Sequence, residues 1–226
     1  MENKGGRRME TKAYKGIGME GALARWYARV THNDKPEFQA LARRMAEGLA
    51  HGASVLEVAP GPGYFAIELA KQGGYRITGL DISATFVEVA RQNAQQEGVD
   101  IDFRRGNASS MPFADCSFDL ILCRAAFKNF TDPVGALREM YRVLKRGGKA
   151  VILDLRKDAS RREIDAHVDQ MHVGKLNAAF IKVTFRLMLL KRAYTREDFE
   201  RFIGTSGFPK FEIGDAPVGF EITLIK

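Results

Sequence analysis

The stretch from Ser54 to Asp81 constrains the fold most strongly, because it joins two strand-like runs through a glycine turn and a helix. The run Val55–Val58 is apolar except for Glu57, which fits a parallel strand buried on both faces. The turn Gly61-Pro62-Gly63 opens the helical run, and its glycines allow a ligand to approach the backbone closely. Asp81 ends the second strand, where a carboxylate can accept hydrogen bonds from ribose hydroxyls. The stretch therefore predicts a site for a nucleoside-bearing ligand.

The rest of the chain repeats the alternation of strand and helix, which predicts an α/β fold. We expect a Rossmann-like, mostly parallel seven-stranded sheet with helices on both faces and an antiparallel C-terminal hairpin. The predicted strands are Val55–Val58, Tyr75–Leu80, Ile101–Arg105, Phe118–Cys123, Lys149–Leu155, Phe211–Gly214 and Gly219–Ile225. The predicted helices cover 22–30, 36–49, 64–72, 84–97, 134–144, 164–174, 175–192 and 195–203.

Length and composition predict a single domain in a cytoplasmic protein. A chain of 226 residues is of ordinary domain size, and no apolar run approaches the roughly 18 residues of a membrane span. The two cysteines, Cys116 and Cys123, are too few for a disulfide framework and lack metal-site spacing, so we expect reduced thiols and no metal. The expected parts are an N-terminal arm or lid at 1–35, a ligand-binding core at 50–155, a helical lid insertion at 156–192, and a final helix and hairpin at 195–226.

The net charge of +7 is concentrated in two segments outside the predicted core. Residues 1–30 hold 7 basic and 3 acidic residues, and residues 156–201 hold 11 basic and 7 acidic ones. Such segments could attract an anionic substrate, a nucleic acid or a lipid surface, or they could be ordinary solvated helix faces. The charge pattern leaves these alternatives open.

Glu57 helps to decide which nucleoside is bound, because a carboxylate before the turn repels a pyrophosphate and suits a cation. Residues 61–66 formally satisfy the dinucleotide pattern G-x-G-x-x-A, which alone is not specific. The run EVAPGPG at 57–63 resembles the first motif, E/D-x-G-x-G-x-G, of class I S-adenosylmethionine-dependent methyltransferases. Ala59 stands at the first glycine of that motif and Pro60 follows it. S-adenosylmethionine carries an ammonium and a sulfonium and no phosphate, which fits Glu57.

Two downstream segments extend the resemblance. Residues 111–119, MPFADCSFD, resemble the family's L-P-F-x-D-x-S-F-D segment. Residues 137–148, LREMYRVLKRGG, resemble L-x-E-x-x-R-V-L-K-P-G-G, with Arg146 in place of the proline. The resemblance covers about residues 50–155 and is similar in pattern to methyltransferases of the ubiquinone/menaquinone-biosynthesis type. It implies S-adenosyl-L-methionine as cofactor and S-adenosyl-L-homocysteine as product.

The resemblance also implies where the cofactor binds. The segment at 106–108 matches the position that contacts adenine, although it could equally be a generic turn. Arg124 and the residue after it match positions near the methionine moiety. The implied cofactor-binding residues are Glu57, Ala59, Gly61, Pro62, Gly63, Asp81, Ile82, Ser83, Gly106, Asn107, Ala108, Arg124 and Ala125.

The acceptor is expected between the N-terminal arm, the loop at 124–130 and the helices at 156–192. The candidate substrate-binding residues are Tyr14, Trp26, Phe127, Lys128 and Phe130. Lys128 could hold an anionic substrate or could be a solvated loop lysine. Many relatives carry a histidine near Lys128 and this chain does not, so a histidine base at that position does not carry over. The candidates for a catalytic residue are Tyr14, Lys128 and His167. The lack of a clear base favours an acceptor that is already anionic or basic.

We therefore expect methyl transfer to a small-molecule acceptor, achieved mainly by proximity and in-line orientation. The basic segments leave two alternatives: methylation of RNA or protein, or a non-catalytic protein that binds S-adenosylmethionine. The identity of the acceptor, the atom that is methylated and the oligomeric state do not follow from the sequence.

Overall fold

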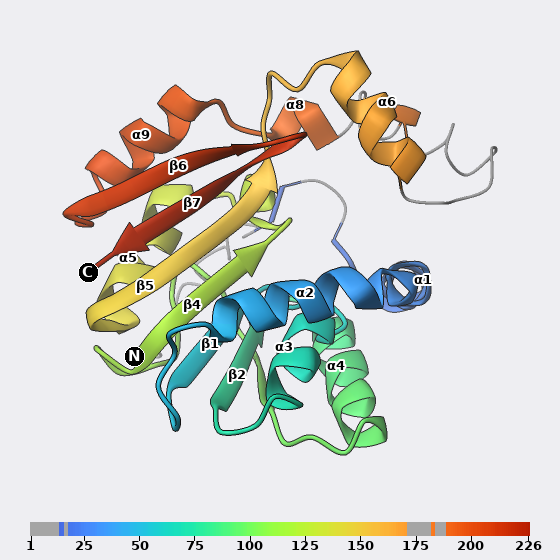
Figure 1. The fold of residues 1–226 in the computed structure, drawn as a ribbon, viewed down its shortest axis with the longest axis vertical. Helices are drawn as coiled ribbons and strands as arrows, with labels where there is room; N and C mark the ends of the chain where they lie inside the picture. The colour runs from blue at the N-terminus through green and yellow to red at the C-terminus, as the bar shows by residue number, and fades with distance from the viewer. Residues whose placement is uncertain (1–13, 16–17, 171–181, 184–188) are drawn as a thin grey trace, which may run out of the picture.

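The structure is a computed structural model that describes residues 14–15, 18–170, 182–183 and 189–226. In these ranges the strands form a seven-stranded sheet in the order β3-β2-β1-β4-β5-β7-β6 (Figure 1). The first five pair in parallel, and β7 runs antiparallel to both β5 and β6. The predicted α/β, Rossmann-like fold with an antiparallel C-terminal hairpin is confirmed.

The strands bring their carboxyl ends to one edge of the sheet. Val58 in β1 pairs with both Leu80 in β2 and Cys123 in β4, so the residues that follow these strands emerge together. The strand bounds are β1 Ser54–Val58, β2 Arg76–Asp81, β3 Asp102–Arg105, β4 Phe118–Arg124, β5 Leu144–Leu155, β6 Lys210–Ala216 and β7 Gly219–Ile225.

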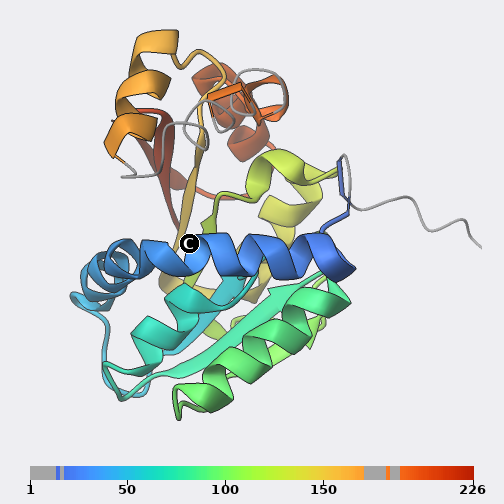
Figure 2. The ribbon, with the colours of Figure 1, turned by 90° about the vertical axis from the view of Figure 1, so that its right-hand side faces the viewer.

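Helices cover both faces of the sheet (Figures 1 and 2). One face packs Val55 and Leu120 against α2, α3 and α4, and the other packs Leu56 and Ile121 against α5 and α9. Neighbouring strand residues therefore point into two different cores, which explains why the strands read as continuous apolar runs. The helix bounds are α1 Gly21–Thr31, η1 His32–Asp34, α2 Lys35–Ala46, α3 Tyr64–Ala70, α4 Ala84–Gln96, η2 Phe127–Asn129, α5 Pro133–Val143, α6 Arg161–Gln170, α8 Leu190–Arg192 and α9 Arg196–Gly204.

Capping residues define where several helices start. Ser83 accepts a hydrogen bond from the Phe86 N–H at the start of α4, and Asp132 accepts one from Gly135 at the start of α5. Thr195 and Asp198 form a capping box at α9. Local hydrogen bonding thus fixes where these elements begin.

The strand β5 is longer than predicted. It begins at Leu144, five residues before Lys149, and its pairing with β4 shifts between Phe118 and Leu120. Four residues of β5, 145–148, therefore lie opposite a single residue of β4, Asp119. The sequence K-R-G-G favours a turn, so pairing across this irregularity could not be read from it.

The insertion after β5 begins with α6, which packs through Ile164 and Val168 against Val218. The expected helical run at 164–174 is helical as far as Gln170, where the described residues end. The run expected at 175–192 lies largely outside the described residues, apart from 182–183 and 189–192. None of the helices in the described ranges is both long enough and apolar enough to cross a membrane. Cys116 is exposed and Cys123 is buried, and both thiols are free.

Candidate functional site

The turn between β1 and α3 holds three residues in the left-handed region, with φ of 57° at Ala59, 54° at Gly61 and 80° at Gly63. A Cβ on Gly63 would lie 2.8 Å from the Phe103 ring, so that glycine is required for packing. A Cβ on Gly61 would meet nothing within 4 Å. The backbone at Gly61 therefore faces open space, where a ligand can approach it.

Glu57 lies buried in β1 immediately before this turn, with 4% of its surface exposed. Its Oε2 accepts a hydrogen bond of 3.1 Å from the Ala66 N–H. Burial raises the pKa of Glu57 to about 8, while that hydrogen bond and the positive charge of Arg124 act in the opposite direction. A cation bound beside this carboxyl group would stabilise its charged form.

Asp81 lies at the tip of β2 and is also buried, with 5% of its surface exposed. Its Oδ2 accepts from the Gly61 N–H at 3.0 Å, and its Oδ1 accepts from the Ser83 N–H at 2.9 Å. Burial raises the pKa of Asp81 to about 6. Each carboxylate oxygen has a second lone pair, so the group can still accept hydrogen bonds from hydroxyls.

The neighbours of Asp81 have mainly structural contacts. Ser83 caps α4 and is buried, whereas Ile82 is partly exposed and accepts a hydrogen bond from Arg105 at its carbonyl. Gly106 donates to the Asp81 carbonyl at 2.9 Å, which brings the segment 106–108 to the same edge of the sheet. Asn107 accepts from the Ser109 N–H through Oδ1 at 3.0 Å, as expected for a turn residue.

Arg124 and Ala125 follow β4 at the same edge. The Arg124 guanidinium pairs with Glu37 at 3.1 Å and lies 4.6 Å from the centre of the Phe38 ring. Ala125 has a φ of 57°, and its N–H donates to the Leu153 carbonyl at 2.7 Å. The polypeptide thus turns sharply beside Glu57, as a site at the strand ends requires.

Lys128 is buried, so the alternative that it is a solvated loop lysine is wrong. Its side chain is buried and its Nζ lies 2.9 Å from Oδ1 of Asp154, while it also donates to the Ala125 carbonyl. The Lys128 N–H donates to Oδ2 of the same carboxylate at 2.8 Å. The ammonium is therefore already paired inside the protein.

The two phenylalanines of this loop are likewise buried, because the 3-10 turn η2 directs them into the core. Phe127 stacks on Phe199 of α9 with ring centres 5.5 Å apart, so it does not face a substrate. Phe130 is buried beside Phe127 and pairs through its backbone with Tyr14. Of these three predicted substrate residues, only Tyr14 belongs to the arm rather than to the core.

The arm reaches the strand ends through Tyr14 and Lys15. The Lys15 N–H donates to the Asn129 carbonyl at 2.7 Å. Burial raises the pKa of the Tyr14 hydroxyl, and the negative charges of Asp81 and Asp154 contribute to this shift. The backbone contacts of Tyr14 and Lys15 place this part of the arm against the loop that follows β4.

The remaining two candidates lie on helices. Trp26 is on α1 and is 47% exposed, in an apolar stripe with Leu23, Tyr27 and Val30. His167 is on α6 in the insertion and is half-buried.

Two residues with clear roles could not be singled out from the sequence. Asp154 is an acidic residue in an apolar strand run, which was its only signal. Glu20 precedes α1 in a glycine-rich segment, and its contacts are to residues more than 60 positions away.

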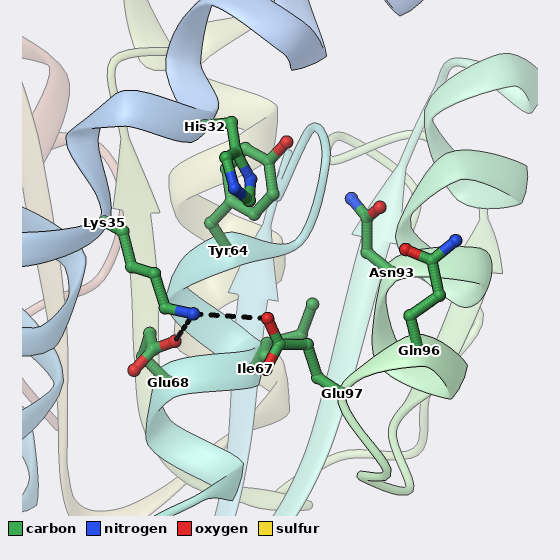
Figure 3. Close-up of a pocket in the computed structure, with 8 residues that line it drawn as sticks. All are labelled: His32, Lys35, Tyr64, Ile67, Glu68, Asn93, Gln96 and Glu97. Carbon is green, nitrogen blue, oxygen red and sulfur yellow. Dashed lines mark hydrogen bonds and ion pairs between the residues drawn. The ribbon is translucent and has the colours of Figure 1, made fainter.

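A cavity of about 50 Å³ lies apart from these residues, between η1, α3 and α4 (Figure 3). Lys35 forms ion pairs there with Glu68 at 3.8 Å and Glu97 at 3.2 Å. This volume suits about one or two water molecules, and the lining includes none of the strand-end residues. The cavity is not a cofactor site.

Comparison with known proteins identifies the family. A model described as a methyltransferase domain matches residues 56–152. A demethylmenaquinone methyltransferase from Chlorobaculum parvum is 30% identical over 190 residues, which cover 81% of this chain and 76% of that protein. One from Deinococcus radiodurans is 42% identical over 117 residues, so the chain spans about half of that relative, 48%.

A solved structure supports the fold assignment. It is described as that of a candidate S-adenosyl-L-methionine-dependent methyltransferase from Methanococcus maripaludis, with a TM-score of 0.75 and 24% identity over 93% of this chain and 95% of that one. The motif that contains Glu57 and the glycine turn lies within the matched domain. The chain belongs to the class I S-adenosylmethionine-dependent methyltransferase family, whose cofactor is S-adenosylmethionine.

Proposed function

We propose that this chain transfers a methyl group from S-adenosylmethionine to a small aromatic acceptor of the quinone type. The observation that carries the cofactor site is the pair of buried carboxyl groups, Glu57 and Asp81, at the ends of adjacent parallel strands. Between them the Gly61 backbone faces open space. An ammonium group suits Glu57 and ribose hydroxyls suit Asp81, so the residues fit this cofactor.

The cofactor supplies an electrophilic methyl group on a sulfonium, and the chain's own residues supply binding and orientation. Glu57 would hold the cationic end, and Asp81 would accept from the ribose. The proposed site also includes Ala59, Gly61, Pro62, Gly63, Ile82, Ser83, Gly106, Asn107, Ala108, Arg124 and Ala125, which lie in the loops that follow β1, β2, β3 and β4.

The proposal of an aromatic acceptor draws on the relatives and on the arm. Two relatives carry the name demethylmenaquinone methyltransferase, which denotes a quinone substrate. The partly exposed stripe of Leu23, Trp26, Tyr27 and Val30 on α1 offers apolar surface to such a ring. Lys128 is paired with Asp154, so the structure offers no support for an anionic acceptor bound by that lysine.

A macromolecular acceptor is not favoured. Several basic residues of the 156–201 segment are paired, among them Arg156 with Glu163, Lys182 with Asp169 and Arg196 with Asp215. Paired charges contribute little to a field that would attract nucleic acid. We propose that the protein acts in the cytoplasm, which rests on its two free thiols.

The test begins with cofactor binding. Titration calorimetry should show binding of S-adenosylhomocysteine by the unaltered protein, and loss of binding in Asp81→Ala and Gly63→Val. The valine side chain would collide with Phe103 and deform the turn. Glu88→Ala is the matched control, because Glu88 is an exposed acidic residue on α4. Unchanged affinity in both site variants would refute the site assignment.

The second step tests the acceptor. A panel of demethylated quinones in their reduced hydroquinone form, together with phenols and catechols, is incubated anaerobically with S-adenosylmethionine, and release of S-adenosylhomocysteine is measured by mass spectrometry. Turnover confined to the quinone class is the expected result. Turnover with RNA or protein only, or with no acceptor in a protein that binds the cofactor, would contradict the proposed activity.

A further inference from the structure

The first turn of α4 is capped by a residue from the distant N-terminal arm. The N–H groups of Ala84 and Thr85 each donate to the Glu20 carboxylate, both at 3.0 Å. The Ser83 hydroxyl takes the next donor, Phe86, at 3.0 Å, and Asp81 takes the Ser83 N–H. The four backbone N–H groups that have no partner within the helix, those of residues 83–86, therefore all donate hydrogen bonds, and two of them donate to Glu20.

Two further bonds extend this contact to the residues on either side of Glu20. The Thr85 hydroxyl donates to Glu20 at 2.6 Å and accepts from the Gly21 N–H at 2.9 Å. The Ser83 hydroxyl donates to the Met19 carbonyl at 2.6 Å. Three consecutive residues of the arm, 19–21, are thus bound to three consecutive residues of the loop and helix start, 83–85. We call this contact the arm clip.

The charge at the arm clip is stabilised by these bonds. Partial burial would raise the pKa of Glu20, but the hydrogen bonds from Thr85 and Ala84 outweigh it and hold the pKa below its usual range. A carboxylate at a helix N-terminus is also stabilised by the helix dipole. Glu20 is therefore ionised at neutral pH, as its role of acceptor requires.

The arm clip lies directly beside the proposed cofactor loop. Ser83 belongs to the clip and its N–H is held by Asp81, whose other oxygen holds the Gly61 turn. At the other end of the arm, residues 14 and 15 contact the loop after β4. A displacement of the arm at residues 19–21 is therefore transmitted to the backbone around Asp81 both through Ser83 and through the Ala84 and Thr85 N–H groups that Glu20 holds.

We propose that Glu20 is a positioning residue that couples docking of the N-terminal arm to cofactor binding. In this proposal Glu20 contacts neither the methyl group of the cofactor nor the acceptor. Its hydrogen bonds hold the start of α1 against the start of α4, which directly follows the Asp81–Ser83 loop. The start of α1 and this loop therefore hold each other in place. The inference rests on the proposed function, because it requires the cofactor to lie at Asp81. By linkage, a ligand that orders this loop must favour the docked arm to the same degree.

The test compares Glu20→Ala and Glu20→Gln with Asp132→Ala. Asp132 is the matched control, because it is a carboxylate that caps a different helix, α5, by accepting from Gly135 at 2.8 Å. Both Glu20→Ala and Asp132→Ala remove a helix cap and should lower the melting temperature to a similar extent. Only the Glu20 variants should change ligand binding.

Titration calorimetry with S-adenosylhomocysteine gives the decisive readout. We expect the dissociation constant to rise about tenfold in Glu20→Ala, within the range usual for coupled sites. The rise should be about threefold in Glu20→Gln, because the amide keeps one acceptor oxygen and presents an N–H to the other backbone donor. Asp132→Ala should bind like the unaltered protein. The glutamine variant keeps the test valid if the alanine variant does not fold.

Limited proteolysis provides a readout independent of affinity. Trypsin can cleave α1 after Arg25 and Arg29, and S-adenosylhomocysteine should slow both cleavages in the unaltered protein but not in Glu20→Ala. Affinities within twofold in all variants, with equal protection, would overturn the coupling. Failure of the unaltered protein to bind the ligand would instead overturn the proposed function on which the coupling rests.

Discussion

The buried pair Lys128–Asp154 makes an asymmetric prediction, because its two partners have different remaining contacts. Replacing Lys128 by Met removes the ammonium, but the Asp154 carboxylate keeps two backbone donors, the N–H groups of Lys128 and Leu155, at 2.8 and 2.7 Å. Replacing Asp154 by Ala leaves a buried ammonium with only the Ala125 carbonyl, and it leaves both of those N–H groups without their acceptor.

These contacts set the expected magnitudes. Breaking a buried ion pair by removing one partner costs about 3–5 kcal/mol, and each buried donor left without a partner adds about 1–3 kcal/mol. We therefore expect Lys128→Met to lower the free energy of unfolding by about 3 kcal/mol and Asp154→Ala by about 5 kcal/mol. The double variant Lys128→Met/Asp154→Leu removes both charges and should be more stable than Asp154→Ala.

Urea unfolding followed by circular dichroism measures these differences. Arg25→Met is the control, because the Arg25–Glu88 pair is 3.9 Å long and exposed, and exposed pairs contribute at most about 1 kcal/mol. Asp154→Asn provides a milder variant if the alanine variant does not fold. The reasoning is refuted if Lys128→Met costs as much as Asp154→Ala, or if neither exceeds the control.

Three further predictions concern the glycine turn and its buried carboxyl group. Ala59→Gly should stabilise the protein by about 0.5 kcal/mol in thermal melts. The substitution relieves the left-handed strain at this position, about 1–2 kcal/mol, and this exceeds the cost of the extra entropy that glycine gives the unfolded chain. A lower melting temperature would contradict this. Because the pKa of Glu57 is raised in the folded state, the folded protein binds more protons than the unfolded chain between pH 4.5 and about 8. The contribution of Glu57 to the free energy of unfolding should therefore fall as the pH rises through this range. Glu57→Gln should remove this pH dependence. For the same reason, calorimetry in buffers of different ionisation enthalpy should show proton release when S-adenosylmethionine binds between about pH 6 and pH 8, and Glu57→Gln should release fewer protons.

Most of the fold could be predicted because its signals are local. The runs around Val55 and Leu120 are apolar on both faces, and Ser83 and Asp132 mark helix starts by hydrogen bonds within one turn. The early start of β5 could not be predicted, because it lies across an irregularity in the pairing with β4, at Asp119. That carboxylate accepts from Ser54 and Lys145, which come from two other strands.

The candidate site likewise has one part that could be predicted from local sequence signals and one part that depends on distant residues. The left-handed turn and the carboxyl groups at its edge follow from short motifs, since the geometry of a strand–turn–helix unit is determined within about 30 residues. The direction of the Lys128 and Phe127 side chains depends instead on Asp154 and Phe199, which lie much later in the chain. A loop lysine with a distant buried partner looks the same in sequence as a solvated one.

The arm contacts two loops of the proposed site, and this has a consequence for the order in which the cofactor and the acceptor would bind. Residues 19–21 are bound to the loop that follows Asp81, while Tyr14 pairs with Phe130 in the loop that follows β4. Residues 14–15 and 19–21 belong to the same arm, so the position of one contact influences the other. A cofactor that orders the Asp81 loop therefore also favours the position of Tyr14 beside the acceptor loop. Such coupling favours binding of the cofactor before the acceptor, since the acceptor surface on the arm is complete only when the arm is docked.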